Sequence, residues 1–478
     1  MGNSKIIYKI LPLLMVFTFA QADEYQEWLK SQSKDYTEYK KTIDEEFDAV
    51  LKQEWEEFQS MNNPSPYKVK KIIVPPKIKK IVKLPKKELV LSPKVVIKPI
   101  IKEKKVVKVN KPLIVYKNKE YAKFNFYSNS ISMHYNKKDV YSFTQASSKN
   151  LANFWEFTSK TKWKELVKQI QVKSKELNLN GWAQYQLIYK LSKDIYRDEN
   201  LANMSTWFFM TKLGYDTKVA YGNNKVYLLS TTQNTIYQVS FYTINSKKYY
   251  LMSPTGKASN NGKIYTYKGE YPKSTNKVSF MMNKAIKVQG KMQTRVLNFK
   301  YYNKKYTIKT EYSKDLIEFY KTFPQSDFTV YFDSKKSQYL SNSVLISLQK
   351  EIKGMSELEA ANFILRFTQT AFKYKTDPDQ FGYEKPMFPE EMLHYPYSDC
   401  EDRAVMYSYL IKNILGLHVV GIKYKGHLST AVSFNSEVDG ENFKYKNKIY
   451  VMADPTFINA NVGMTMRQYK KAKFEIIE

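Results

Sequence analysis

Apolar and polar positions along the chain divide it into periodic segments and one segment without periodicity. In residues 23–61, aromatic residues recur three, four or seven positions apart among Glu, Lys and Gln, and this spacing predicts an amphipathic helix. Residues 62–115 consist largely of Lys, Val, Ile and Pro, and recurrent proline excludes helix and favours extended chain. We therefore expect a disordered, semi-rigid linker there and globular structure from residue 116 onward.

The globular part repeats one order of predicted elements. Two helical patterns, the second ending in Leu-Gly, are followed by β-rich segments and a turn containing Pro-Thr. Gly214 would correspond to Gly416, and Ser253 to Asp454. Two α+β domains can also share such an order by chance, so the spacing leaves open whether the repeat is a true duplication.

Helical and strand-like patterns mixed in this way indicate the α+β class. At 478 residues, more than one domain is expected. We place one domain at residues 116–290 and a second at residues 291–478.

The N-terminus, "MGNSKIIYKILPLLMVFTFAQADEY", has the pattern of a secretory signal peptide. Lys5 and Lys9 precede an apolar run, and Ala20-Gln21-Ala22 forms a small-x-small cleavage site. The apolar run is shorter than the ~20 residues that a membrane span needs. We therefore expect cleavage after residues 1–22, no transmembrane anchor in the mature chain, and a periplasmic or extracellular location.

Charge suggests an anionic partner. The formal net charge is +31, mostly from lysine. In an exported protein, the Lys-rich linker would associate with anionic cell-wall or outer-membrane polymers, or it would be a solvated spacer without a partner. Export argues against nucleic acid as the partner. The excess of Lys over Arg argues against it too, because Arg makes the better bidentate contacts with phosphate.

Cys400 is the only cysteine, so the chain is not a disulfide scaffold. It stands where a helical pattern begins, with Asp399 as a candidate N-cap and Gly416 as the residue after the helix. A helix N-terminus stabilises a thiolate, so we expect a lowered pKa for this thiol. Glu401 and Asp402 are interpreted as ordinary helix-start residues.

A thiol nucleophile needs a base, and the chain has 4 histidines. His427 lies in "KGHLSTAVSF", which alternates like a strand, and the strand pattern "KIYVMADPT" ends in Asp454. Side chains on neighbouring strands, ~4.8 Å apart, can touch across one face, so Asp454 can orient the imidazole. His418 is interpreted as structural, and His394 as a residue at the rim of the site.

The segments "DCEDRAV", "GHLSTAV" and "YVMADPTF", in this order, resemble the transglutaminase-like (papain-like) superfamily. The resemblance covers roughly residues 340–470 and includes "FGYEKPMFPEEML", which is similar to the loop before the cysteine in bacterial members. It implies a nucleophile-bearing helix packed on an antiparallel sheet, with Cys400 as nucleophile, His427 as general base and acid, and Asp454 as orienting residue. No cofactor and no metal ion is expected. Ser398 departs from the glycine that many members carry two residues before the cysteine.

An oxyanion hole should combine the Cys400 backbone amide with a second donor. Tyr397 and Gln380 are the candidates, and the sequence does not choose between them. The first domain has no cysteine, and Ser253 replaces the aspartate, so we interpret it as a degenerate, non-catalytic copy.

These observations predict an exported thiol enzyme that acts on amide bonds of a protein or peptide through an acyl-enzyme. A cysteine peptidase or amidase of the cell envelope is the leading hypothesis. A protein-crosslinking transglutaminase is one alternative, because the fold does not decide whether water or an amine resolves the acyl-enzyme. A non-catalytic, envelope-binding scaffold is the other.

Overall fold

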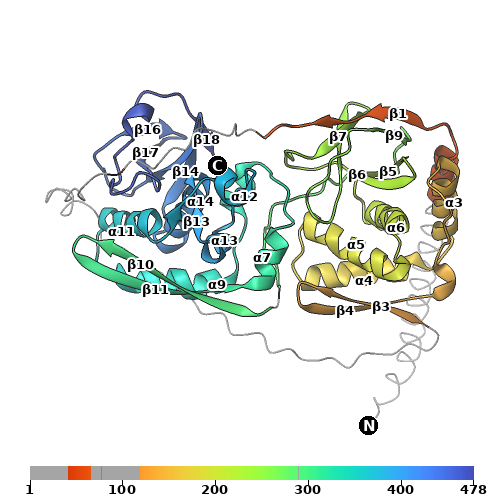
Figure 1. The fold of residues 1–478 in the computed structure, drawn as a ribbon, viewed down its shortest axis with the longest axis horizontal. Coiled ribbons are helices and arrows are strands. Elements are labelled where there is room, and N and C mark those ends of the chain that lie inside the picture. Colours follow the sequence, from red (N-terminus) through yellow and green to blue (C-terminus); the bar gives the residue numbers. More distant parts are fainter. Residues whose placement is uncertain (1–40, 66–76, 78–118, 289) are drawn as a thin grey trace, which may run out of the picture.

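The protein has two lobes that lie side by side in the computed structural model, which describes residues 41–65, 77, 119–288 and 290–478 (Figure 1). It is 36% helical and 28% strand, and its larger sheets are antiparallel. The predicted α+β class is therefore confirmed. The predicted signal peptide and nearly all of the predicted linker lie outside the described residues.

The first lobe is built on a seven-stranded antiparallel sheet in the order β1-β9-β5-β6-β8-β7-β2. Helices α5 and α6 pack beside it, and α6 covers β5 and β6. Its elements are the hairpin β3 (Glu120–Phe126) and β4 (Asn129–Tyr135), the helices α3 (Ser148–Ser159), α4 (Trp163–Glu176), α5 (Gly181–Tyr196) and α6 (Glu199–Lys212), and the strands β5 (Thr217–Gly222), β6 (Lys225–Ser230), β7 (Ser240–Ile244), β8 (Lys247–Leu251) and β9 (Lys263–Thr266).

The predicted helix over residues 23–61 is wrong in its C-terminal part. Helix covers residues 41–51, and β1 (Glu56–Gln59) and β2 (Met61–Asn62) then close the two edges of the first-lobe sheet. Open edges of a sheet offer unpaired backbone groups, and pairing with β9 and β7 outweighs the local helical spacing. Residues 23–40 lie outside the described part of the chain.

The second lobe carries a five-stranded antiparallel sheet in the order β16-β17-β15-β14-β18. The helix α14 (Cys400–Ile414) packs against β14 and β15, and α11 (Glu357–Thr370) packs between α14 and the long hairpin of β10 and β11. The strands are β10 (Met292–Tyr301), β11 (Lys304–Ser313), β12 (Lys373–Tyr374), β13 (Tyr397–Ser398), β14 (His418–Tyr424), β15 (His427–Ser433), β16 (Asn442–Tyr445), β17 (Lys448–Ala453) and β18 (Glu475–Ile477), and the remaining helices are α7 (Lys314–Tyr320), α8 (Phe328–Asp333), α9 (Gln338–Leu340), α10 (Ile346–Glu351), α12 (Asp377–Phe381) and α13 (Pro389–His394).

The two lobes share a topology. In each, a hairpin packs against the first of two helices, and the second helix leads into four strands; their order is β5-β6-β8-β7 in the first lobe and β14-β15-β17-β16 in the second. Gly214 and Gly416 both follow the second helix with positive φ, of 91° and 70°, the left-handed conformation that favours glycine. One large difference is that residues 371–399 separate α11 from α14, whereas two residues separate α5 from α6. A common origin of the lobes remains a prediction.

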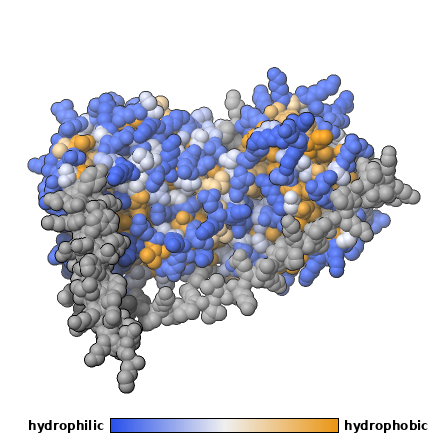
Figure 2. Space-filling model, turned by 180° about the vertical axis from the view of Figure 1, so that it is seen from behind, coloured by the Kyte–Doolittle hydropathy of each residue, from blue (hydrophilic) through white to orange (hydrophobic). Residues whose placement is uncertain are grey.

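Packing is continuous across the two lobes. Helices α7 and α8, which follow the expected domain boundary at residue 290, belong to the core of the first lobe, together with Phe388, Ala404 and Leu428 of the second. The face seen in Figure 2 is mainly hydrophilic, with its apolar residues in separate groups. Among the described helices, none is long and apolar enough to cross a membrane.

Candidate active site

Cys400 is the first residue of α14 and is partly buried. The backbone before it is fixed by Asp402, whose carboxylate accepts hydrogen bonds from the Asp399 amide at 3.1 Å and from the Met387 amide at 2.8 Å. These bonds satisfy amide groups that a helix start leaves without partners. The thiol is therefore held at the end of a rigid helix.

His427, the first residue of β15, and Asp454, the residue after β17, form a buried pair. The Nε2 atom of His427 lies 2.8 Å from Oδ2 of Asp454, and the two residues are 7% and 3% exposed. The other carboxylate oxygen of Asp454 accepts from the amides of Thr456 at 2.8 Å and Phe457 at 3.3 Å. Because Nε2 is engaged, Nδ1 is the ring nitrogen left for proton exchange.

The thiol lies beside this pair but is not hydrogen-bonded to it. Sγ of Cys400 bonds to Oε2 of Glu401 at 2.9 Å, and the Leu428 backbone, next to His427 in β15, also lies within hydrogen-bonding reach of the thiol. The Tyr469 ring stacks on His427 at 5.0 Å, and burial, together with its nearness to Cys400 and Asp454, raises the pKa of its hydroxyl. No hydrogen bond joins Cys400 to His427 among the described residues.

The thiol is not activated in the way that its helix position predicts. Burial and the negative charges of Glu401 and Asp399 raise the pKa of the Cys400 thiol well above its ordinary value, and only the Leu428 backbone acts in the opposite direction. The prediction of a lowered pKa is wrong for this state of the site, because two adjacent carboxylates and desolvation outweigh the helix dipole.

Five carboxylates, which we call the acidic cluster, lie around the N-terminus of α14. They are Asp377, Glu384, Asp399, Glu401 and Asp402. Oxygens of Asp377, Glu384 and Glu401 lie within 4.8 Å of one another, and carboxylate oxygens are the ligands that hard cations such as Ca²⁺ prefer. Sequence reasoning missed the first two members, because they come from the insertion between α11 and α14 and only the fold brings them to the cysteine.

Burial, and then the negative charge of Glu401, raise the pKa of Glu384 to about 7 and that of Asp402 to about 7. The folded protein therefore binds these protons more tightly than the unfolded chain does. Their contribution to stability is fully present below about pH 4 and is lost as the pH rises toward about 7. We expect Glu384→Gln to remove part of this loss, so that the free energy of unfolding changes less than in the wild type over this range.

Urea unfolding in the presence of a chelator, at several pH values across this window, measures the difference. The exposed residue Glu437 provides the matched control, and Glu437→Gln should follow the wild-type profile. Parallel profiles for Glu384→Gln and the wild type would contradict the raised pKa.

A buried glutamine on α11 holds the loop that follows Asp454. The side-chain amide of Gln369 donates to the carbonyl oxygens of Asp454, Phe457 and Ala460 at 3.0, 2.8 and 3.1 Å. Its carbonyl oxygen accepts from Arg366 at 2.7 Å. The position of Asp454 thus depends on a residue that carries no charge.

The two oxyanion candidates differ in the partners of their side chains, and the choice between them remains a prediction. Both amide atoms of Gln380 are buried and have no hydrogen-bond partner, and its helix α12 also carries Asp377 of the acidic cluster. Tyr397 is partly exposed in β13, where the Lys375 ammonium lies 5.4 Å from the centre of its ring. Gln380 therefore offers the unused N–H donor.

The remaining histidines lie outside this arrangement. His394 ends α13 and bonds to the Tyr312 hydroxyl at 3.3 Å, and His418 is exposed at the start of β14. His134 belongs to β4 of the first lobe.

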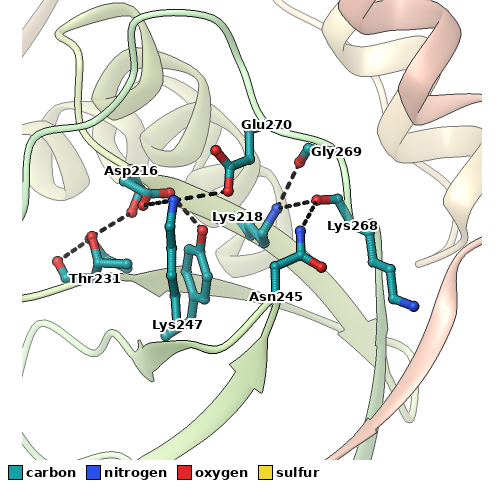
Figure 3. Close-up of polar contacts among 10 residues, drawn as sticks. Asp216, Lys218, Thr231, Asn245, Lys247, Lys268, Gly269 and Glu270 are labelled. Atoms are coloured by element: carbon teal, nitrogen blue, oxygen red, sulfur yellow. Dashed lines mark hydrogen bonds and ion pairs between the residues drawn. The ribbon is translucent and has the colours of Figure 1, made fainter.

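The first lobe has different chemistry at the matching positions. By topology, Glu199, Lys225 and Ser253 stand where the second lobe has Cys400, His427 and Asp454. Figure 3 shows a polar network elsewhere in this lobe, which joins the sheet to the loop of residues 268–270. The residues drawn there pair with one another: Lys247 bonds Asp216 and Glu270 at 3.4 and 2.9 Å, and Lys218 donates to the carbonyls of Lys268 and Gly269 at 3.3 and 2.7 Å. This network fastens the loop of residues 268–270 to the sheet.

Comparison with known proteins found no match to a family model, to a curated protein or to a solved structure. The resemblance to the transglutaminase-like superfamily therefore remains a prediction from motif residues.

Proposed function

We propose that the protein is an exported cysteine peptidase or amidase of the cell envelope with a papain/transglutaminase-like core. The observation that supports this most strongly is the buried His427–Asp454 pair at 2.8 Å, next to the strand residue whose backbone approaches the Cys400 thiol. A histidine oriented by a buried carboxylate beside a thiol at a helix start is the arrangement that nucleophilic catalysis requires.

In this proposal the thiol is neutral in the free enzyme. As a substrate carbonyl approaches, the thiol turns from Glu401 and transfers its proton to Nδ1 of His427, while Asp454 stabilises the imidazolium. The S–C bond forms, the C–N bond breaks, and the imidazolium gives its proton to the leaving amine. Water then attacks the thioester with His427 as base, which releases the acid and restores the thiol.

The transglutaminase alternative is favoured by one observation. Glu384 is only partly buried, so the acidic cluster presents a carboxyl beside the site that would attract a lysine amine as acceptor. The scaffold alternative is favoured by another, since the thiol bonds to Glu401 rather than to His427.

Trapping of an acyl-enzyme tests the proposal without knowledge of the natural substrate. After incubation with p-nitrophenyl acetate, we expect mass spectrometry to find one acetyl group on Cys400 of the wild type. In the Cys400→Ser variant we expect no acetyl group on residue 400. An unmodified Cys400 in the folded protein would favour the scaffold. A large increase in deacylation by added lysine amine would favour the transglutaminase.

Gln380→Ala should lower the acylation rate by about 10²-fold, because one oxyanion donor typically contributes this much. Tyr397→Phe, which removes only the hydroxyl of the other candidate, should leave the rate within about twofold of the wild type on the same reasoning. The burst of p-nitrophenolate measures both rates. An equal loss of acylation rate in the two variants, or a loss confined to Tyr397→Phe, would contradict the assignment of Gln380 as the second donor of the oxyanion hole.

A further inference from the structure

A cleft between the two lobes lies next to the acidic cluster. Its volume is about 380 Å³, and it is open to solvent. Its walls come from residues 237–239 and 256–259 of the first lobe, from residues 320, 321 and 323–325 and Tyr331 around α7 and α8, and from residues 383–386, Phe388 and Glu391 of the second lobe. The volume is at the lower end of small-ligand pockets, so the cleft has room for a short part of an extended chain that continues into solvent.

The cleft leads toward the catalytic cysteine through Glu384. This residue lines the cleft and also belongs to the acidic cluster, where one of its oxygens lies within 4.8 Å of a Glu401 oxygen. Glu401 in turn bonds the Cys400 thiol at 2.9 Å. A chain lying in the cleft therefore reaches the acidic cluster, whose member Glu401 contacts the thiol.

The first lobe supplies one wall through the loop that matches the Asp454 turn. Residues 256–259 follow Ser253, and Lys257 of this loop places its ammonium 3.8 Å from the centre of the Tyr383 ring in the opposite lobe. In the second lobe the loop after β17 holds Asp454. The corresponding loop of the first lobe, after Ser253, instead forms a wall of the cleft. This gives the first lobe a binding role without a catalytic residue.

Most charges in the cleft are already paired. Lys385 forms a buried ion pair with Glu391, and Lys321 pairs with Glu318 at 2.7 Å. Lys257 is exposed and forms no ion pair with any described residue. The first-lobe wall therefore offers one available cation.

Polar and aromatic groups complete the lining. The side-chain carbonyl oxygen of Gln325 is buried without a hydrogen-bond partner and can accept from a peptide N–H. Three aromatic side chains of the lining, Tyr237, Phe323 and Tyr383, are partly exposed and can bind apolar parts of a chain, whereas Tyr320, Tyr331 and Phe388 are buried beneath the wall.

We propose that the cleft binds an extended segment of the polypeptide substrate, with an acidic side chain of this segment at Lys257. The inference rests on the proposed function for the identity of the segment as a substrate, whereas binding itself needs no catalysis. Charge complementarity at Lys257 favours an acidic over a basic side chain at this point of the cleft, whereas the carboxyl of Glu384, which also lines the cleft, would favour a basic one beside the acidic cluster.

The test uses the full chain with Cys400→Ala, so that bound peptide is not consumed. The probes are three fluorescein-labelled decapeptides that contain Tyr-Ala-X-Ala-Tyr, with X as Asp, Asn or Lys, and anisotropy gives each Kd. We expect the Asp peptide to bind about fivefold more tightly than the Asn peptide, and Lys257→Glu to reverse the order of the Asp and Lys peptides. Lys225→Glu, an exposed change of the same charge in the same lobe, should preserve the order.

Equal Kd values for the three peptides, absence of binding, or an equal effect of Lys225→Glu would overturn the inference. The two proposals fail separately. If Lys257 still sets the order of the peptide Kd values but p-nitrophenyl acetate does not acylate Cys400, the proposed thiol chemistry is overturned and peptide binding in the cleft is retained. If Cys400 is acylated but the three peptides bind equally, the thiol chemistry is retained and the cleft proposal is overturned.

Discussion

His427→Ala is expected to slow the acylation of Cys400 by p-nitrophenyl acetate about 10²-fold or more near pH 7, the range that general bases contribute. Because burial and acidic neighbours raise the pKa of the thiol, almost none of it is thiolate at this pH, and attack needs a base. Asp454→Asn keeps the shape but removes the charge that stabilises the imidazolium, so it should lose about tenfold or more. The p-nitrophenolate burst, read by stopped flow, gives the rates.

His418→Ala is the matched control, since His418 is an exposed histidine on the neighbouring strand β14. It should acylate at the wild-type rate. If His427→Ala also acylates at that rate while Cys400→Ser does not react, then another group is the base, and Glu401 is the first candidate. The assignment of Cys400, His427 and Asp454 as a catalytic triad is then wrong.

Gln369→Leu is expected to have the largest effect on stability. Leucine keeps the volume of the side chain but removes the donor that the carbonyls of Asp454, Phe457 and Ala460 share. The carbonyls of Asp454 and Phe457 keep backbone donors, the amides of Phe457 and Ala460, whereas the Ala460 carbonyl loses its donor. A buried acceptor without a partner costs about 1–3 kcal/mol and each lost hydrogen bond about 0.5–1.5 kcal/mol, so the sum should be about 2–4 kcal/mol after local relaxation. Urea unfolding measures this loss, and acylation should fall with it as Asp454 loses its position.

Gln468→Leu makes the same substitution at an exposed position, where the amide reaches only the Met466 sulfur. It should unfold within about 0.5 kcal/mol of the wild type. A Gln369→Leu variant with wild-type stability and acylation would show that the loop is held by its other contacts, such as the bond from the Thr456 amide to Asp454.

Local sequence signals placed the groups that sit on regular elements. Asp399 before the helix and Gly416 after it predicted the two ends of α14, and the structure has both. His427 and Asp454 meet because β15 and β17 pair as antiparallel neighbours, although β16 intervenes in the chain. The chain passes from β15 to the edge strand β16 and then returns as β17 between them. The alternation of side chains predicted the strands that carry His427 and precede Asp454, and a sheet with one buried face fixes their register.

Long-range contacts set what the sequence did not predict. The raised pKa of the thiol comes first from its burial, which only the fold determines, and then from Glu401 and Asp399, which flank Cys400 in the sequence. Asp377 and Glu384 of the acidic cluster lie in the insertion of residues 371–399, and no local spacing relates them to Cys400. In the same way, β1 and β2 form because the first-lobe sheet has open edges, not because residues 56–62 favour strand. Helical spacing near Trp55 was therefore misleading.

The rate of Cys400 alkylation by iodoacetamide across about pH 5–10, in the wild type, Glu401→Gln and His427→Ala, tests the central claim most directly. We expect a wild-type midpoint above the ~8.5 of an ordinary thiol, a lower midpoint in Glu401→Gln, and slower alkylation at neutral pH in His427→Ala. Three identical profiles would show that neither neighbour acts on the thiol, and would contradict the assignment of Cys400 as the nucleophile.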